Sequence, residues 1–370
     1  MTMFKLAHAG GSGDWMELAE SCVAGLGAPR SATLGFVYAT DVFAAEFDAI
    51  VAHLRSATGI ATWVGTIGVG IVAGAREYFD TPAIAAMVTD LPAERFHLLP
   101  PASGDALPES LGAWMRARGP TVAVVHGDGR DQRLNDRLAD LSDLPGAFVL
   151  GGLGSTRTPM QQVAGEIGRG PLAGIVFARD TIMATGLTQG CAPIGRGRRR
   201  ITKAEGNVVH TLDENPAIEA LQADLLSLPE RERELAVRRL HVALPVVGSD
   251  GADYLVRNLV GIDPQRGAII IGDLAEPGRE LIFVRRDPGA AAIDLRRMAR
   301  ETRARGRAAP RAALYFTCLA RGPNLFGPDS EELATLRAEI GDAPLIGLFC
   351  DGEISNARLY GYTGVLALFS

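Results

Sequence analysis

The sequence predicts an α/β protein of the mixed (α+β) type, in which helices lie on the outside of mixed β-sheets. Two observations carry this prediction. Apolar residues make up 47% of the 370-residue chain, and short apolar runs typical of strands alternate with amphipathic segments typical of helices. A chain of this length is expected to form about two domains. We expect an N-terminal extension at 1–30 and tandem domains at 31–207 and 208–370, divided where the periodicity is weakest.

A unit of strand, helix, strand and strand recurs along the chain. The first instance begins with TLGFVYAT (Thr33–Thr40), the second with TVAVVHGD (Thr121–Asp128) and the third with AALYFTCLARG (Ala312–Gly322). In each, a helical segment leads to a strand that contains glycine, and a loop leads to a last apolar strand. A helical connection predicts that the first two strands are parallel, and a loop predicts that the last two are antiparallel.

The segment between the second and third units predicts further strands and helices. NPAIEALQADLLSL is typical of a helix, with Asn215 as its N-cap and Pro216 at its first position. Four short strands follow, at HVALPVVG, YLVRNLVGID, GAIIIGDL and ELIFVRRD, separated by residues typical of turns. This arrangement adds a second, strand-rich part to the predicted fold.

Composition and spacing exclude several classes of function. A net charge of −6 argues against a nucleic-acid-binding protein. The cysteines form no C-x-x-C pair and the histidines no ligand-like spacing, so we expect reduced thiols and no metal. No glycine-rich stretch fits the dinucleotide motif, so we expect no cofactor. The twenty uncharged residues 56–75 are long enough for a bilayer, but glycine and threonine dilute them. We therefore expect no membrane span and a cytoplasmic protein.

Several long segments resemble a known family. GCAPIG followed by ITKAEGNVVHTLDENPAIEAL resembles the junction of the two FIST domains. YLVRNLVGIDPQRGAIIIGDL, FTCLARGPNLFG, PLIGLFCDGEI and GYTGVLAL resemble the FIST C domain in their order, and VLGGLGS and GPLAGIVFA resemble the FIST N domain. The resemblance covers about residues 31–370 and is looser before Thr121.

The resemblance implies an intracellular sensory module that binds a small ligand, with amino acids as one suggested class. FIST domains often accompany a signalling output domain, and in eukaryotes an F-box. Because the resemblance occupies almost the whole chain, we expect the signal to leave through a separate partner protein.

The third unit ends in residues that suggest a ligand site. The buried-strand pattern of PLIGLFCDGEIS stops at Cys350, Asp351 and Glu353. If its strand is parallel to the one that ends at Cys318, Arg321 lies at the same edge of the sheet, where ligands of α/β proteins bind. We expect Arg321 and Glu353 to line a cavity with the two cysteines at its wall. The alternatives are an Arg321–Glu353 salt bridge and, for Asp351, a turn.

Three further residues are candidates for ligand binding. Cys191 in TQGCAPIG stands near several arginines, which favour a reactive thiolate, or it is a small buried residue in a turn. Arg257 and Asn258 interrupt an apolar strand. Arg257 then either binds a ligand carboxylate or forms a structural ion pair.

The sequence therefore favours a cytoplasmic small-ligand sensor that binds an amino acid or an organic acid and signals through a partner protein. Two alternatives stay open. One is an enzyme that uses Cys191, Cys318 or Cys350 with a carboxylate, although no Ser-His-Asp or Cys-His spacing supports it. The other is an adaptor that binds another protein.

Overall fold

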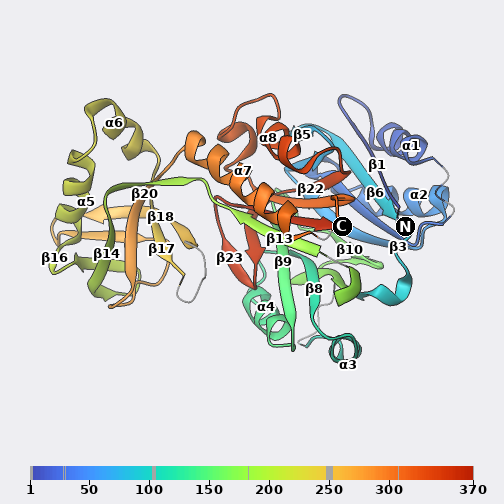
Figure 1. The fold of residues 1–370 in the computed structure, drawn as a ribbon, viewed down its shortest axis with the longest axis horizontal. Helices are drawn as coiled ribbons and strands as arrows, with labels where there is room; N and C mark the ends of the chain where they lie inside the picture. Colours follow the sequence, from blue (N-terminus) through green and yellow to red (C-terminus); the bar gives the residue numbers. More distant parts are fainter. Residues whose placement is uncertain are drawn as a thin grey trace. The chain divides into compact units, whose positions relative to one another are not determined.

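The computed structural model describes residues 3–369 except 28, 30, 102–105, 182, 247–252 and 307 (Figure 1). The chain forms two compact units, and neither is a continuous stretch of sequence. Unit 1 comprises Met1–Thr188, Asp294–Leu359 and Thr363–Ser370, and unit 2 comprises Gln189–Ile293 and Tyr360–Tyr362. The boundary expected at 207/208 falls in the turn between strands β14 and β15 of unit 2.

The first sheet of unit 1 has the strand order β1-β6-β2-β3-β10-β11. The stretch expected to be an N-terminal extension supplies β1, which pairs antiparallel with β6. The strands are β1 (Phe4–Gly10), β2 (Leu34–Thr40), β3 (Thr62–Gly68), β6 (Ala83–Thr89), β10 (Gln162–Ala164) and β11 (Glu166–Gly168).

The second sheet of unit 1 has the strand order β13-β24-β21-β22-β9-β8-β12-β7, and β4 and β23 also pair with β22. A hairpin of β4 and β5 thereby reaches this sheet from the first repeat unit. The strands are β4 (Gly70–Ala73), β5 (Arg76–Phe79), β7 (Phe96–Leu99), β8 (Thr121–Gly127), β9 (Ala147–Gly154), β12 (Leu172–Phe177), β13 (Met183–Thr188), β21 (Ala312–Cys318), β22 (Leu345–Ser355), β23 (Arg358–Tyr360) and β24 (Gly364–Phe369).

All three predicted repeat units lie in unit 1 and share one topology. In each, the two strands joined by a helix are parallel, as predicted: β2 with β3, β8 with β9 and β21 with β22. The sequence predicted that the last strand of each unit pairs with the second strand, and this was wrong. That strand pairs antiparallel with the first strand of its unit, as β6 with β2, β12 with β8 and β24 with β21, because the second strand takes its other neighbour from elsewhere in the chain.

Glycine in the second strand of each unit allows the parallel pairs to form. A Cβ at each of these positions would overlap the carbonyl oxygen of the residue directly opposite on the first strand. No side chain larger than hydrogen fits there, so the repeated glycines are explained by close backbone packing. The pairs are Gly65 with Val37, Gly151 with Val125, and Gly347 with Tyr315.

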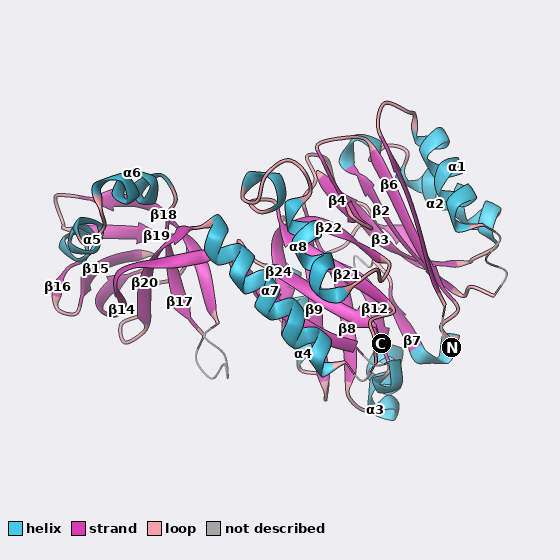
Figure 2. Cartoon of the chain, turned by 45° about the horizontal axis from the view of Figure 1, so that its top comes forward, coloured by secondary structure: helices cyan, strands magenta, loops and turns pink. Residues whose placement is uncertain are grey.

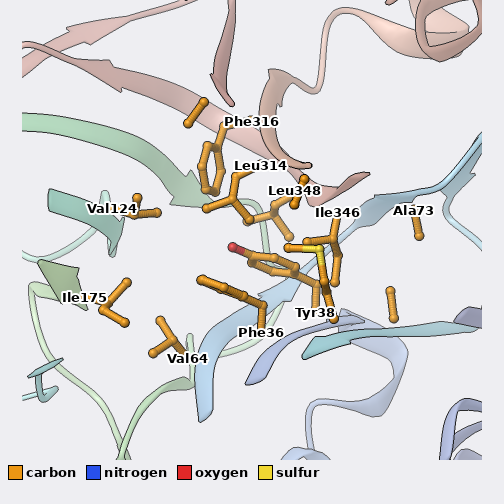
Figure 3. Packing of buried hydrophobic residues seen from close by; sticks show 14 of the residues in the cluster. Phe36, Tyr38, Val64, Ala73, Val124, Ile175, Leu314, Phe316, Ile346 and Leu348 are labelled. Atoms are coloured by element: carbon orange, nitrogen blue, oxygen red, sulfur yellow. The ribbon is translucent and has the colours of Figure 1, made fainter. Parts of the chain in front are cut away.

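The two sheets of unit 1 pack face to face, and helices cover their outer faces. Between the sheets, Phe36 and Tyr38 of β2 meet Leu314 and Phe316 of β21, together with Leu348 of β22 (Figure 3). Figure 2 shows α1 and α2 beside the first sheet. The helices α3 and α4 pack on one part of the second sheet, and α7 and α8 on another. Their bounds are α1 (Trp15–Leu26), α2 (Phe47–Thr58), α3 (Glu109–Arg118), α4 (Leu134–Ser142), α7 (Pro288–Arg305) and α8 (Glu331–Ile340), with 3-10 turns η1 (Asp41–Phe43), η2 (Ala93–Arg95), η3 (Arg179–Thr181) and η4 (Gly322–Asn324).

Unit 2 is a six-stranded barrel within the described residues. Its strand order is β14-β20-β17-β18-β19-β15, and pairing of β14 with β15 closes the ring. Asn215 and Pro216 form β16, and α5 begins at Ala217 with Pro216 as its N-cap, so the predicted cap at Asn215 was wrong by one residue. The elements are β14 (Cys191–Glu205), β15 (Val208–Leu212), β16 (Asn215–Pro216), β17 (Leu240–Pro245), β18 (Tyr254–Asp263), β19 (Ala268–Ile271), β20 (Glu280–Arg286), α5 (Ala217–Leu226) and α6 (Glu230–Arg238).

The uncharged residues 56–75 include β3 and β4, which lie in the two sheets of unit 1. Among the described residues, every helix is too short or too polar to cross a membrane.

The requirement for glycine in the second strand of each repeat unit can be tested at Gly347. We expect Gly347→Ala to lower the free energy of unfolding by more than about 2 kcal/mol, because the added methyl group must displace the β21 backbone. Chemical denaturation of the purified protein measures this change. Gly261→Ala is the matched control, since the nearest atom to its added Cβ is 3.7 Å away. Equal costs for the two variants would contradict the close-approach explanation.

Candidate functional site

The parallel pairing of β21 and β22 brings predicted site residues together where β21 ends in the second sheet. Cys318 and Cys350 are direct partners across the two strands. The backbone N–H of Leu319 donates to the carbonyl of Cys350 at 2.9 Å, which fixes the start of the turn that carries Arg321. The sequence pattern placed the end of this strand at Cys350, Asp351 and Glu353, but β22 runs on to Ser355, so Asp351 lies in the strand and not in a turn. A ligand site shared by Cys318, Arg321, Cys350 and Glu353 stays a prediction.

Arg321 forms a fully buried ion pair, but its partner is Glu332 of α8 and not Glu353. Its Nε donates to Glu332 Oε1 at 2.7 Å, and the two side chains are 0% and 1% exposed. The carboxylate of Glu332 also accepts hydrogen bonds from Tyr315 Oη at 2.7 Å, from Thr317 Oγ1 at 3.1 Å and from the N–H of Gly322 at 2.8 Å. The Glu332 carboxylate is therefore held in place by four donor groups.

The two terminal nitrogens of Arg321 are buried and have no hydrogen-bond partner among the residues that the structure describes. The guanidinium carbon lies 5.1 Å from the centre of the Phe326 ring, a cation–π contact that satisfies none of the N–H groups. Buried donors without partners are rare, and each costs about 1–3 kcal/mol or more when the group is charged. These nitrogens are therefore buried donors that a bound group could use.

Glu353 is also fully buried and only half satisfied. Its Oε2 accepts from Thr363 Oγ1 at 2.6 Å and from the Thr363 N–H at 3.1 Å. Its Oε1 has no partner within the described part of the chain. Burial raises the pKa of Glu353 to about 8, against the lowering effect of the Thr363 hydrogen bonds and of the Arg321 charge. At neutral pH this carboxyl is therefore mostly protonated, and it has one O–H to donate.

A cavity of about 510 Å³ in unit 1 lies beside this buried cluster. Its lining includes Arg76, Glu77 and Asp329. Glu77 lines this cavity and also reaches the cluster at Arg321. Its Oε2 is buried without a partner among the described residues, and it would lie 3.0 Å from a Cβ added to Gly322, the residue after Arg321. Neither this cavity nor the one described below for unit 2 includes Arg321 or Glu353, so a cavity shared by those two residues stays a prediction.

The cysteines of the site are buried thiols. Cys350 is fully buried among the apolar side chains between the sheets. Burial raises its pKa well above the ordinary value, and the nearby Glu353 and Cys318 raise it further. A raised pKa disfavours the thiolate, which is the reactive form of cysteine. Asp351, between Cys350 and Glu353, is exposed.

The other predicted site residues lie in unit 2. Arg257 donates from its Nε to Asp273 Oδ2 at 2.9 Å, which is the structural ion pair named above as its alternative. The side-chain oxygen of Asn258 accepts from Tyr362 Oη at 2.5 Å. Cys191 is buried, and its carbonyl accepts from Tyr254 Oη at 3.1 Å. These three residues are outside the cluster at Arg321.

Unit 2 has a cavity of about 620 Å³, with Arg199 and Asp224 in its wall. Here the buried arginine is satisfied: Arg199 Nε and Nη2 both donate to Asp224, at 3.0 and 2.5 Å, and Nη1 lies 3.5 Å from Asp213. Arg199 and Arg321 are both buried arginines paired with a carboxylate, and they differ in whether terminal N–H groups remain available. Arg199 is therefore a matched control for Arg321.

Sequence reasoning missed Glu332, Glu77 and Thr363. A signal for Glu332 was present, because it is four and eight residues before the buried Leu336 and Ile340 and so shares their helix face. A glutamate on the apolar face of a helix requires a buried partner. Glu77 and Thr363 gave no such signal, because they reach the cluster from a hairpin and from a loop.

Family models match most of the chain. The FIST N domain matches residues 33–215, and the FIST C domain matches residues 217–356. The uncharacterized protein Rv0628c of Mycobacterium tuberculosis (strain H37Rv) is 31% identical over 353 residues, which cover 86% of each chain. The uncharacterized protein Mb0898c of Mycobacterium bovis is 30% identical over 344 residues, which cover 83% of this chain and 82% of the relative.

The chain belongs to the FIST family. FIST domains are proposed to be sensory, ligand-binding domains, as the sequence resemblance implied.

The raised pKa of Glu353 predicts how stability depends on pH. The folded protein holds this proton up to about pH 8, whereas the unfolded chain releases it near the ordinary value of about 4.3. Folding stability from this group is therefore present below about pH 4 and is lost as the pH rises to about 8, by about 1.4 kcal/mol per pH unit. We expect Glu353→Gln to remove this part of the slope in denaturation measured across that range.

The glutamine variant imitates the protonated acid, so we expect its stability at neutral pH to stay near that of the parent. Glu20→Gln is the control, because Glu20 is exposed. An unchanged slope in Glu353→Gln would mean that Glu353 is ionised in the folded protein.

A double-mutant cycle tests the buried pair of Arg321 and Glu332. Arg321→Met leaves Glu332 charged and buried, so we expect a loss of about 3–5 kcal/mol in the free energy of unfolding. Adding Glu332→Gln recovers part of this loss, because the uncompensated charge disappears. The exposed pair Arg198–Glu280 should give a coupling energy near zero in the same cycle. A similarly small coupling for Arg321 and Glu332 would refute the buried ion pair.

Proposed function

We propose that unit 1 binds a small metabolite with a carboxylate group, an amino acid or an organic acid. In this proposal the protein acts in the cytoplasm as a sensor and passes its signal to a separate partner protein. The observation that carries the proposal is the fully buried Arg321, whose terminal nitrogens have no partner. Membership of the FIST family supports the sensory role.

A carboxylate is the ligand group that fits Arg321. A guanidinium presents its N–H groups in a planar fork that matches the two oxygens of a carboxylate. Nε already binds Glu332, which leaves the terminal nitrogens for a second acceptor. The protonated Oε1 of Glu353 would supply one more donor to the same acceptor. Cys318 and Cys350 would then form the wall of the site, with Asp351 at its exposed margin.

The cavity at Glu77 is the proposed entrance. Its volume of about 510 Å³ falls within the usual range of about 300–1,000 Å³ for small-molecule sites. Arg76, Glu77 and Asp329 place both signs of charge in its lining. Such a lining suits a zwitterion, which brings a positive group and a negative group together.

The charge count of the cluster favours an amino acid over a simple organic acid. Arg321 and Glu332 neutralise each other, and a ligand carboxylate alone would add an uncompensated negative charge to a buried site. The ammonium group of an amino acid restores neutrality within the ligand. The cysteine-dependent enzyme finds no support at Cys350, because burial disfavours its thiolate.

A thermal-shift screen of single amino acids and their deaminated organic acids tests the proposal. A ligand present at 100 times its dissociation constant should stabilise the fold by about 2.7 kcal/mol. We expect one or more amino acids to raise the melting temperature of the parent protein. Glu353→Leu should reduce this shift, because leucine offers no donor to the ligand carboxylate, whereas Glu353→Gln keeps an N–H at this position and should retain most of the shift.

Two arginine variants test whether the ligand binds in unit 1 or in unit 2. Arg321→Lys keeps the charge but loses the planar fork, so it should abolish the ligand-induced shift. Arg199→Lys should lower the stability of unit 2 and keep the shift. The reverse result would place the ligand in the unit 2 cavity, and no shift with any tested compound would refute the proposal.

A further inference from the structure

Glu77 connects the cavity of unit 1 to the buried cluster at Arg321. It lies on β5, and its Oε1 accepts from the N–H of Leu333 at 3.1 Å. Its own N–H donates to Ser330 Oγ at 3.0 Å. The hairpin is thereby attached to the first turn of α8, the helix that carries Glu332. A change in the charge of Glu77 acts on both the cavity and the buried ion pair.

The charged groups around Glu77 balance one another, so a charge on Glu77 itself has no counter-charge of its own. Glu332 faces it from α8 and Arg321 from the end of β21, and these two cancel each other. Within the cavity lining, Arg76 and Asp329 are the other charged residues. From β1, His8 bonds to Tyr78 Oη at 2.7 Å, and burial together with the charge of Arg76 lowers its pKa. His8 is therefore neutral at physiological pH and adds no charge.

Three carboxyl groups thus lie near the Arg321 guanidinium: Glu332 is bonded to it, and the guanidinium charge also acts to lower the pKa of Glu77 and of Glu353. Glu332 is the one whose oxygens are fully supplied with donors, whereas Glu77 and Glu353 each keep one oxygen without a partner. Burial, and next the charge of Glu332, raise the pKa of Glu77 to about 7. The pKa of Glu353 is raised to about 8. In the empty protein at neutral pH, Glu77 is therefore partly protonated.

We propose that Glu77 is a proton switch: it gives up its proton to solvent when the ammonium group of an amino acid occupies the cavity of unit 1. This inference rests on the proposed function, because it requires an amino acid as the ligand. The ammonium group favours the carboxylate form of Glu77, so the O–H bond breaks, the electron pair stays on the carboxylate and the proton leaves to water. The protonation state of Glu77 then depends both on ligand binding and on pH.

The proton balance sets the size of the effect. At pH 7 Glu77 is about half protonated, so binding should release about half a proton. At pH 5.5 the release approaches one proton, and at pH 8.5 it approaches none. The dissociation constant should rise about tenfold for each pH unit below 6, because the proton competes with the ligand, and should change little above pH 8.

Isothermal titration calorimetry in phosphate and in Tris buffer measures the released protons, because these buffers differ in ionisation enthalpy. The probe is the proteinogenic L-amino acid with the largest thermal shift, and its deaminated acid is the comparison compound. We expect about half a proton released at pH 7 by the parent protein and none by Glu77→Gln. Glu331→Gln is the control, because Glu331 lies in the same helix turn as Glu332 but is exposed; it should release as much as the parent.

Infrared difference spectroscopy gives a second measurement that needs no folded variant. Addition of the amino acid to the parent protein should reduce the band of protonated carboxyl groups at pH 6. Binding without proton release, or with the same release in Glu77→Gln, would overturn the switch and leave the proposed function standing. The absence of binding by every amino acid would overturn both.

Discussion

The site depends on the parallel pairing of β21 and β22, which places Cys318 directly opposite Cys350. This register forms because Gly347 lets the second strand approach the carbonyl of Tyr315. The chain then turns at the end of β21 and presents Arg321, while β22 continues to Glu353. Each of the three repeats has the same pairing and the same kind of glycine, but the third carries the buried arginine with its carboxyl groups.

A buried arginine with unsatisfied N–H groups is costly for a protein that needs only a stable fold. Arg199 of unit 2 shows the usual solution, in which Asp224 and Asp213 face its guanidinium group. Arg321 has one carboxylate, Glu332, which is fixed by Tyr315, Thr317 and Gly322. The pair is therefore positioned and neutral, and its unused donors stay available. That combination suits recognition of an acidic group better than it suits stability.

The two parts of the proposal act through one set of contacts. The β4–β5 hairpin pairs with β22 and is bonded through Glu77 to the first turn of α8. Occupation of the cavity at Glu77 would thereby alter the charge beside Glu332 and the contacts of α8. Since Tyr315 and Thr317 of β21 also bond to Glu332, the response reaches the centre of the second sheet. In the proposed function, these contacts would carry the effect of ligand binding from the cavity to the second sheet.

The sequence by itself determined the mixed α/β class, the threefold unit and the parallel pairs, which place Cys318 opposite Cys350, because apolar periodicity and short connections are local properties of the chain. It left Arg257 as either a ligand-binding residue or one half of an ion pair, and the structure pairs it with Asp273. Only the tertiary structure decided that Arg321 pairs with Glu332 and that Glu77 and Thr363 join the cluster. It also decided that the residues before and after the segment that forms the barrel fold together in unit 1. These contacts join residues far apart in the chain, and the spacing along a strand or helix carries no information about which distant hairpin or loop packs against it.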